Sequence, residues 1–133
     1  MRYRSRPSRV CVSRVCVSLV SLASLAACHG GGSARLEGRW KGLHADGVGP
    51  DALLAANAFA SQTEIDVHGD QITVTTPRDH QAGKYRVVRE DRTQVVIATD
   101  RDGPDDAQTF TFVDERTMRW TVLEGKTITL ARQ

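Results

Sequence analysis

The segment 108–130, QTFTFVDERTMRWTVLEGKTITL, decides the fold of this 133-residue chain. Apolar side chains alternate there with polar ones, mostly threonines, in three runs that short polar turns separate. A period of two is typical of β-strands with one buried face, and turns of a few residues join antiparallel neighbours. The segment therefore predicts three sequential antiparallel strands that share one apolar face.

The same alternation extends back to residue 38. Five further runs bring the total to about eight short strands: one begins at residue 38, and the others lie near 64–68, 72–75, 84–87 and 94–99. Loops are expected at 77–81 and 100–106. Only residues 51–59 have roughly helical spacing. Because a meander hides one apolar face and its edges by closing on itself, we expect an all-β fold. The predicted architecture is a small antiparallel meander barrel of about eight strands, with one short helix between the first two strands.

The apolar face predicts which side chains fill the barrel. The inward-facing set comprises Trp40, Ile65, Val67, Ile72, Val74, Tyr85, Val87, Phe110, Phe112, Met118, Trp120, Val122, Ile128 and Leu130. Eight strands enclose an interior that side chains fill completely or that holds one small ligand. A bulky set of this kind is more often packed core than pocket.

The N-terminal segment has the pattern of a secretory signal. Residues 1–14 carry five arginines and no acidic residue, and residues 15–27 carry no charge. The apolar run is shorter than the roughly 20 residues that span a bilayer. It ends in Leu25-Ala26-Ala27-Cys28, which resembles the lipobox of bacterial lipoproteins. That resemblance implies cleavage before Cys28, a diacylglycerol on its thiol, and a further fatty acyl chain such as palmitate on its new amino group.

These features predict three parts of the chain. We expect a lipoprotein signal peptide at residues 1–27, a flexible Gly-rich tether with the acylated cysteine at 28–35, and the β-barrel domain at 36–133. His29 follows the cysteine where an aspartate would signal inner-membrane retention in enterobacteria. The expected location is the bacterial cell envelope, lipid-anchored in the outer membrane and facing the periplasm.

Charge and cysteine content change once residues 1–27 are removed. The whole chain has 18 basic and 16 acidic residues, and loss of five arginines leaves 13 basic residues and a net charge of −3. A mildly acidic body argues against nucleic acid as a partner. Cys28 is then the only cysteine, so we expect no internal disulfide and a barrel that depends on its core.

Two ends of the barrel sequence resemble the calycins, the group of lipocalins and their relatives. Gly38-Arg39-Trp40 resembles the G-x-W of the first calycin strand, and Arg132 resembles the arginine that stacks on that tryptophan. The resemblance implies that Trp40 and Arg132 close one end of the barrel. The helix at 51–59 resembles the lid of fatty-acid-binding proteins, with Phe59 as gate. The candidate pocket residues are Trp40, Phe59, Tyr85, Phe110, Phe112 and Trp120.

The chain shows no motif for catalysis or for a resident metal. His44, Asp46 and Ser61 are the residue types of a catalytic triad, but their spacing does not join them, and no nucleophile elbow or phosphate loop is present. Residues 100–106 are rich in aspartate, yet the glycine comes too early for an EF-hand and no glutamate follows at the twelfth position. We therefore expect a non-enzymatic protein without metal or cofactor.

Two functions remain open. The first is binding of a small apolar ligand or lipid inside a lipocalin-like barrel. The alternative is a packed β-domain that acts through its surface on an envelope protein, as a periplasmic inhibitor or an assembly factor. The deciding observation is an interior volume of about 300 Å³ or more that solvent can reach.

Overall fold

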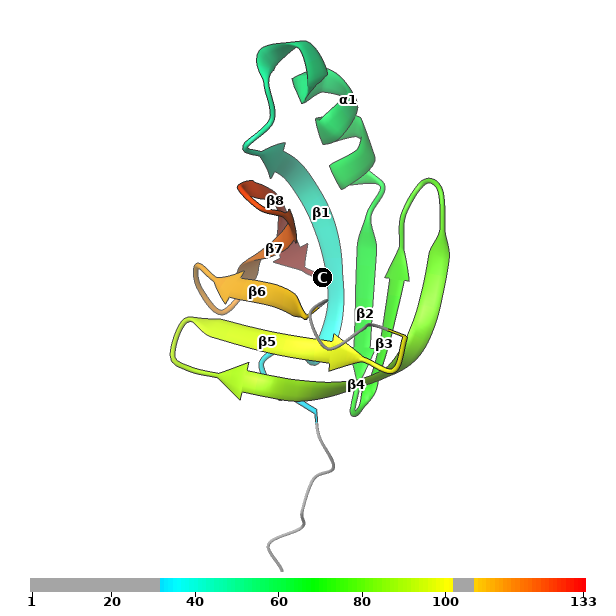
Figure 1. The fold of residues 1–133 in the computed structure, drawn as a ribbon, viewed down its shortest axis with the longest axis vertical. Helices are drawn as coiled ribbons and strands as arrows, with labels where there is room; N and C mark the ends of the chain where they lie inside the picture. Colours follow the sequence, from blue (N-terminus) through cyan, green and yellow to red (C-terminus); the bar gives the residue numbers. More distant parts are fainter. Residues whose placement is uncertain (1–31, 102–106) are drawn as a thin grey trace, which may run out of the picture.

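Eight antiparallel strands close into a barrel in the computed structural model, which describes residues 32–101 and 107–133 (Figure 1). The elements in order are β1 (Gly38–Asp46), α1 (Pro50–Ser61), β2 (Glu64–His68), β3 (Gln71–Thr75), β4 (His80–Glu90), β5 (Gln94–Thr99), β6 (Gln108–Phe112), β7 (Thr117–Leu123) and β8 (Lys126–Arg132). Each strand pairs with the next in sequence, and β8 pairs with β1. The predicted all-β meander barrel, with its helix after the first strand, is confirmed. Cys28 and the signal segment lie outside the described residues.

Most of the predicted inward-facing side chains form the core. The buried ones are Trp40, Ile65, Val67, Ile72, Tyr85, Phe110, Phe112, Met118, Ile128 and Leu130, with Val74, Val87 and Trp120 partly buried against them. Val122 differs, because 40% of its surface is exposed. The register of β7 against β8 shifts at this position, and such a bulge interrupts the strict alternation on which the prediction depended.

Helix α1 has a different role from the predicted lid. Strand β2 pairs with β1 only up to Lys41, so the rest of β1 has one open edge. The helix and the residues after it cover that edge: Gly42 N–H donates to Thr63 O at 2.8 Å, and Ala45 N–H donates to Asn57 Oδ1 at 2.9 Å. Because an unpaired strand edge invites wrong pairing, we infer that α1 completes the barrel wall beside β1.

Proline and glycine explain where α1 starts and how closely it approaches. Pro50 occupies the first turn, where its missing N–H costs no hydrogen bond, and Asp51 complements the positive end of the helix. The helix extends over 50–61, somewhat beyond the predicted 51–59. A side chain at Gly42 would overlap with the carbonyl oxygen of Ala60, so only glycine permits this contact.

The described chain begins with a turn that packs on one end of the barrel. Ser33 is only 3% exposed, its N–H donates to Tyr85 Oη at 3.1 Å, and its Oγ donates to Glu90 Oε1 at 3.0 Å. Leu36 is fully buried. The predicted flexible tether at 28–35 therefore has to end before Ser33, because the backbone and side chain of that residue bond to the barrel. Residues 28–31 lie outside the described part.

Candidate ligand-binding site

Trp40 and Arg132 lie against each other at one end of the barrel. Arg132 Cζ is 4.3 Å from the centroid of the Trp40 ring, and Phe112 meets the same ring edge-on at 6.0 Å. The Trp40 indole N–H donates to Leu36 O at 2.8 Å. Since Trp40 is fully buried, this end of the barrel is closed.

Arg132 also joins the two ends of the described chain. Its guanidinium donates to Glu37 O at 2.6 Å, to Arg35 O at 2.9 Å and to Glu115 O at 3.3 Å. A planar guanidinium reaches several acceptors at once while its face remains stacked on the indole. Arg132 of the last strand, β8, therefore holds the N-terminal turn against the end of the barrel.

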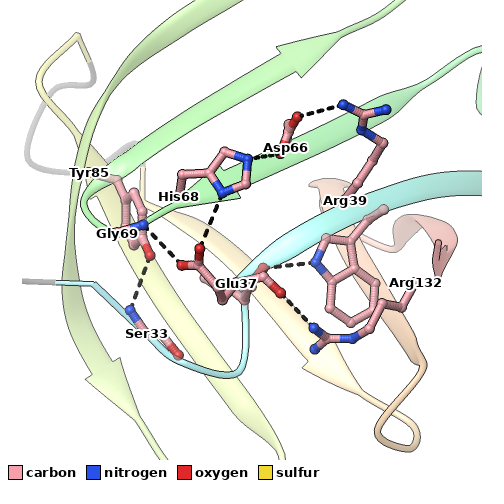
Figure 2. Close-up of polar contacts among 10 residues, drawn as sticks. Ser33, Glu37, Arg39, Asp66, His68, Gly69, Tyr85 and Arg132 are labelled. Atoms are coloured by element: carbon pink, nitrogen blue, oxygen red, sulfur yellow. Dashed lines mark hydrogen bonds and ion pairs between the residues drawn. The ribbon is translucent and has the colours of Figure 1, made fainter.

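A row of charged side chains lies on one side of the closed end, beside β1 and β2 (Figure 2). Glu37 accepts a hydrogen bond from Gly69 N–H at 2.9 Å and lies 3.2 Å from His68 Nδ1, and these contacts, the first most strongly, lower the pKa of Glu37. His68 Nε2 lies 3.0 Å from Asp66 Oδ1, but too poorly aligned for a hydrogen bond. Asp66 also pairs with Arg39 at 3.3 Å. These contacts join β1, β2 and the following turn.

A hollow of about 370 Å³ lies on the outside of the same end. Its walls carry both signs of charge, since Asp114 and Glu115 line it together with Arg35 and Arg92. Arg35 is already stacked on Phe112 at 4.2 Å and bonded to Asp91 O. Although this hollow is the larger one, its charged groups are mostly engaged with the protein itself, so it is a weaker candidate than the interior.

The opposite end of the barrel contains an interior cavity of about 310 Å³. Its walls come from β3 to β7 and from the turn between β3 and β4. The lining residues are Ile72, Val74, Thr76, Asp79, Gln81, Ile97, Thr99, Gln108, Phe110, Trp120 and Val122. Trp40 and Phe112 fill the closed end, whereas polar residues such as Gln81, Thr99 and Gln108 are interspersed with the apolar ones at this end. The barrel is therefore packed in one half and hollow in the other.

The cavity has apolar walls and an aromatic pair. Phe110 and Trp120 stack with their centroids 6.3 Å apart and their planes 18° apart. The indole N–H of Trp120 donates to Gln108 Oε1 at 2.9 Å. This bond satisfies the one polar atom of the ring, so the rings present apolar surface to a ligand.

Polar groups mark the rim. Asp79 lies in the turn before β4, where its Oδ2 accepts from Gln81 Nε2 at 2.6 Å and its Oδ1 accepts from His80 N–H at 2.8 Å. These two hydrogen bonds, that from Gln81 first, lower the pKa of Asp79. The rim therefore carries an ionised carboxylate at neutral pH.

Only two of the predicted pocket residues line this cavity, Phe110 and Trp120. Trp40 and Phe112 belong to the closed end, and Tyr85 is buried with its hydroxyl bonded to Ser33. Burial raises the pKa of Tyr85. The predicted set has to be corrected because alternation identifies inward positions and does not say which layer of the barrel a residue occupies.

Phe59 is the remaining predicted pocket residue, and it does not gate the interior. It lines a neighbouring groove of about 290 Å³ between α1 and the β7–β8 hairpin, with Ala56, Leu123 and Ile128. Val122 borders both the groove and the interior cavity. Phe59 does not reach the cavity, because α1 packs along the edge of β1 and contributes no residue to the cavity lining.

The polar rim was missed by the sequence prediction. The pattern predicts a loop at 77–81, but β4 begins at His80 and Gln81 pairs with inward-facing Val74. Gln108 is two residues before Phe110 and shares its face of β6. Both positions follow the same alternation as the apolar residues. The alternation therefore also places these polar side chains on the inner face of the barrel.

The residues considered for catalysis do not assemble. His44 Nε2 lies 3.3 Å from Asp46 Oδ2 in a half-exposed pair on β1, whereas Ser61 Oγ donates to Ala58 O at the end of α1. No group of three or more potential metal ligands occurs within residues 32–101 and 107–133. The aspartate-rich stretch at 102–106 lies outside that range. In the same described part, no helix has the length and apolar character needed to cross a membrane.

Comparisons with protein-family models, with curated proteins and with solved structures found no significant match to this chain. The geometry of the barrel itself is therefore the basis for a functional proposal.

Proposed function

We propose that this chain is a non-enzymatic binding protein of the bacterial cell envelope, which holds a small apolar molecule in the open half of its barrel. The observation that carries the proposal is the interior cavity of about 310 Å³. Ligand sites begin at about 300 Å³, and an apolar cavity of about 150 Å³ already holds one benzene ring. The ligand is therefore small, about the size of two or three aromatic rings.

The closed end supports the same proposal. The stack of Arg132 on Trp40 is the contact that the calycin resemblance implies, and it makes a rigid floor beneath the hollow half. Gly38 has φ of 110°, a conformation that glycine adopts without strain, which explains a glycine two residues before the tryptophan. We propose that the barrel works as a calycin-type container.

Filling the cavity tests this proposal. Val74→Trp is expected to weaken binding of the neutral fluorescent probe N-phenyl-1-naphthylamine by about tenfold or more, because an indole at residue 74 occupies the volume that the probe needs. The matched control is Thr73→Trp, on the neighbouring position of β3 that alternation places on the other face. The measurement is the increase in probe fluorescence during titration of each purified variant.

Two results would overturn the binding proposal. One is a wild-type barrel that does not bind the probe. The other is a folded Val74→Trp variant, checked by circular dichroism, that binds the probe as tightly as the Thr73→Trp control does.

We also propose that the barrel is anchored through Cys28 with its closed end toward the membrane. Gly32, four residues after Cys28, lies beside Tyr85 Oη and Gly69 at the closed end. A chain reaches at most about 3.5 Å per residue, so four residues would tether Gly32 within about 14 Å of an anchor. The open mouth would then point away from the bilayer, where a soluble ligand reaches it.

Removal of the acylated thiol tests the anchor. Cys28→Ser is expected to move most of the protein from the membrane pellet to the soluble envelope fraction, since two or more acyl chains are needed for stable anchoring. Cys16→Ser, within the predicted signal, is the control that keeps the protein in the pellet. Membrane association of Cys28→Ser equal to that of wild type would disprove the anchor.

One observation favours the alternative of a surface-acting protein. Leu54 is 85% exposed on α1, and Leu123, which lines the same groove as Phe59, is 60% exposed on the β7–β8 hairpin. Such a surface is suited to an envelope protein as partner. Val74→Trp separates the two functions, because it fills the interior and leaves this outer surface unchanged.

A further inference from the structure

One charged side chain of the described residues lines the interior cavity. Asp79 is the only ionisable side chain among the described residues that line the cavity, and it is exposed in the turn before β4. The carboxylate is ionised at neutral pH, since hydrogen bonds from Gln81 and His80 lower its pKa. A ligand that fills the apolar part therefore places its outer end near a negative charge.

Three hydrogen-bond donors among the lining residues bond within the protein. Thr76 Oγ1 donates to Asp79 O at 3.2 Å, Gln81 Nε2 donates to Asp79 Oδ2 at 2.6 Å, and Trp120 Nε1 donates to Gln108 Oε1 at 2.9 Å. Thr99 and Gln108 take part in interactions of their own. Carboxylate oxygens have lone pairs left after one hydrogen bond each, so Asp79 still accepts from a ligand.

Two arginines lie near the rim but are not among the residues that line the cavity. Arg78 lines the neighbouring groove beside α1, and Arg101 lines a small hollow between β4 and the end of β5. Arg101 lowers the pKa of Asp79 through space, which stabilises its ionised form. Neither arginine lines the cavity, so no described guanidinium is placed to receive the carboxylate of a fatty acid there.

We infer that the ligand is a small apolar amine, protonated at neutral pH, whose ring or short chain enters the cavity while its ammonium group meets Asp79 at the rim. This inference deepens the proposed function and rests on it. Each end of this ligand matches the part of the site that it meets. The apolar walls favour the uncharged ring or chain, and the carboxylate of Asp79 accepts hydrogen bonds from the ammonium group. A fatty acid would place two negative charges at the same mouth.

A set of three ligands with the same ring and different head groups tests the inference. Wild-type protein is titrated calorimetrically with 1-naphthylmethylammonium, 1-naphthylmethanol and 1-naphthylacetate at neutral pH and low salt. We expect the ammonium to bind about fivefold more tightly than the alcohol, and the acetate to bind more weakly than either, as suits a partly exposed ion pair. Asp79→Asn is expected to remove the advantage of the ammonium and to leave the affinity for the alcohol unchanged.

Asp70→Asn is the control for total charge. Asp70 lies in the turn between β2 and β3 at the closed end, where it pairs with Lys84 at 3.6 Å. Its loss changes the net charge by the same amount and is expected to leave the preference for the ammonium intact.

The possible results separate the inference from the proposed function. Binding of the acetate as tight as that of the ammonium, or an unchanged ammonium affinity in Asp79→Asn, would overturn the inference and leave an interior ligand site standing. Failure of all three compounds and of N-phenyl-1-naphthylamine to bind wild-type protein would overturn both.

Discussion

Gly42→Ala is expected to lower the free energy of unfolding by about 3 kcal/mol, at the upper end of what overpacking costs. The new methyl group would overlap with the carbonyl oxygen of Ala60. This oxygen belongs to the backbone and accepts a hydrogen bond from Thr63 N–H at 2.9 Å, so it cannot turn away as a flexible side chain could. Moving Ala60 away would also stretch the bond from Gly42 N–H to Thr63 O. The measurement is urea unfolding followed by circular dichroism.

Gly49→Ala is the matched control for this substitution. Gly49 precedes α1 with φ of −66°, which alanine adopts freely, and nothing lies within 4 Å of an added methyl group. Its loss of stability is expected to stay below about 1 kcal/mol. Equal stability of the Gly42 and Gly49 variants would show that α1 does not press against the edge of β1.

Arg132→Ala is expected to lower the free energy of unfolding by about 3 kcal/mol. The substitution removes hydrogen bonds to the carbonyl oxygens of Arg35, Glu37 and Glu115, and it removes the cation from the face of Trp40. Charge-assisted hydrogen bonds contribute about 1.5–3 kcal/mol and a cation over an indole about 0.5–2 kcal/mol, and these contributions overlap within one side chain. Chemical unfolding measures the loss, and a red shift of tryptophan emission reports water at Trp40.

Two further variants show which property of Arg132 matters. Arg132→Lys keeps the charge but lacks the planar fork that reaches several carbonyl groups, so it is expected to recover less than half of the lost stability. Arg119→Ala, on the exposed face of β7, is the control and should change stability by no more than about 0.5 kcal/mol. A loss in Arg119→Ala as large as in Arg132→Ala would contradict a specific closing role.

Much of the fold follows from local pattern. The alternation in residues 108–130 requires strands with one apolar face, and the short turns require antiparallel neighbours. Closure into a barrel follows because eight short strands with one apolar face have no other way to hide it without an exposed edge. Trp40 and Arg132 were expected together on resemblance, and they are in contact in the structure.

The sequence by itself determined the class of fold, the number of strands and most of the side chains that point inward, because each depends on neighbours only a few residues apart. The tertiary structure alone decided that one half of the barrel is packed and the other hollow, that α1 covers the edge of β1, and that Asp79 reaches the rim. The physical reason is register. Which inward residues share a layer depends on strand stagger and on bulges such as that near Val122, and these arise only when all the strands pair.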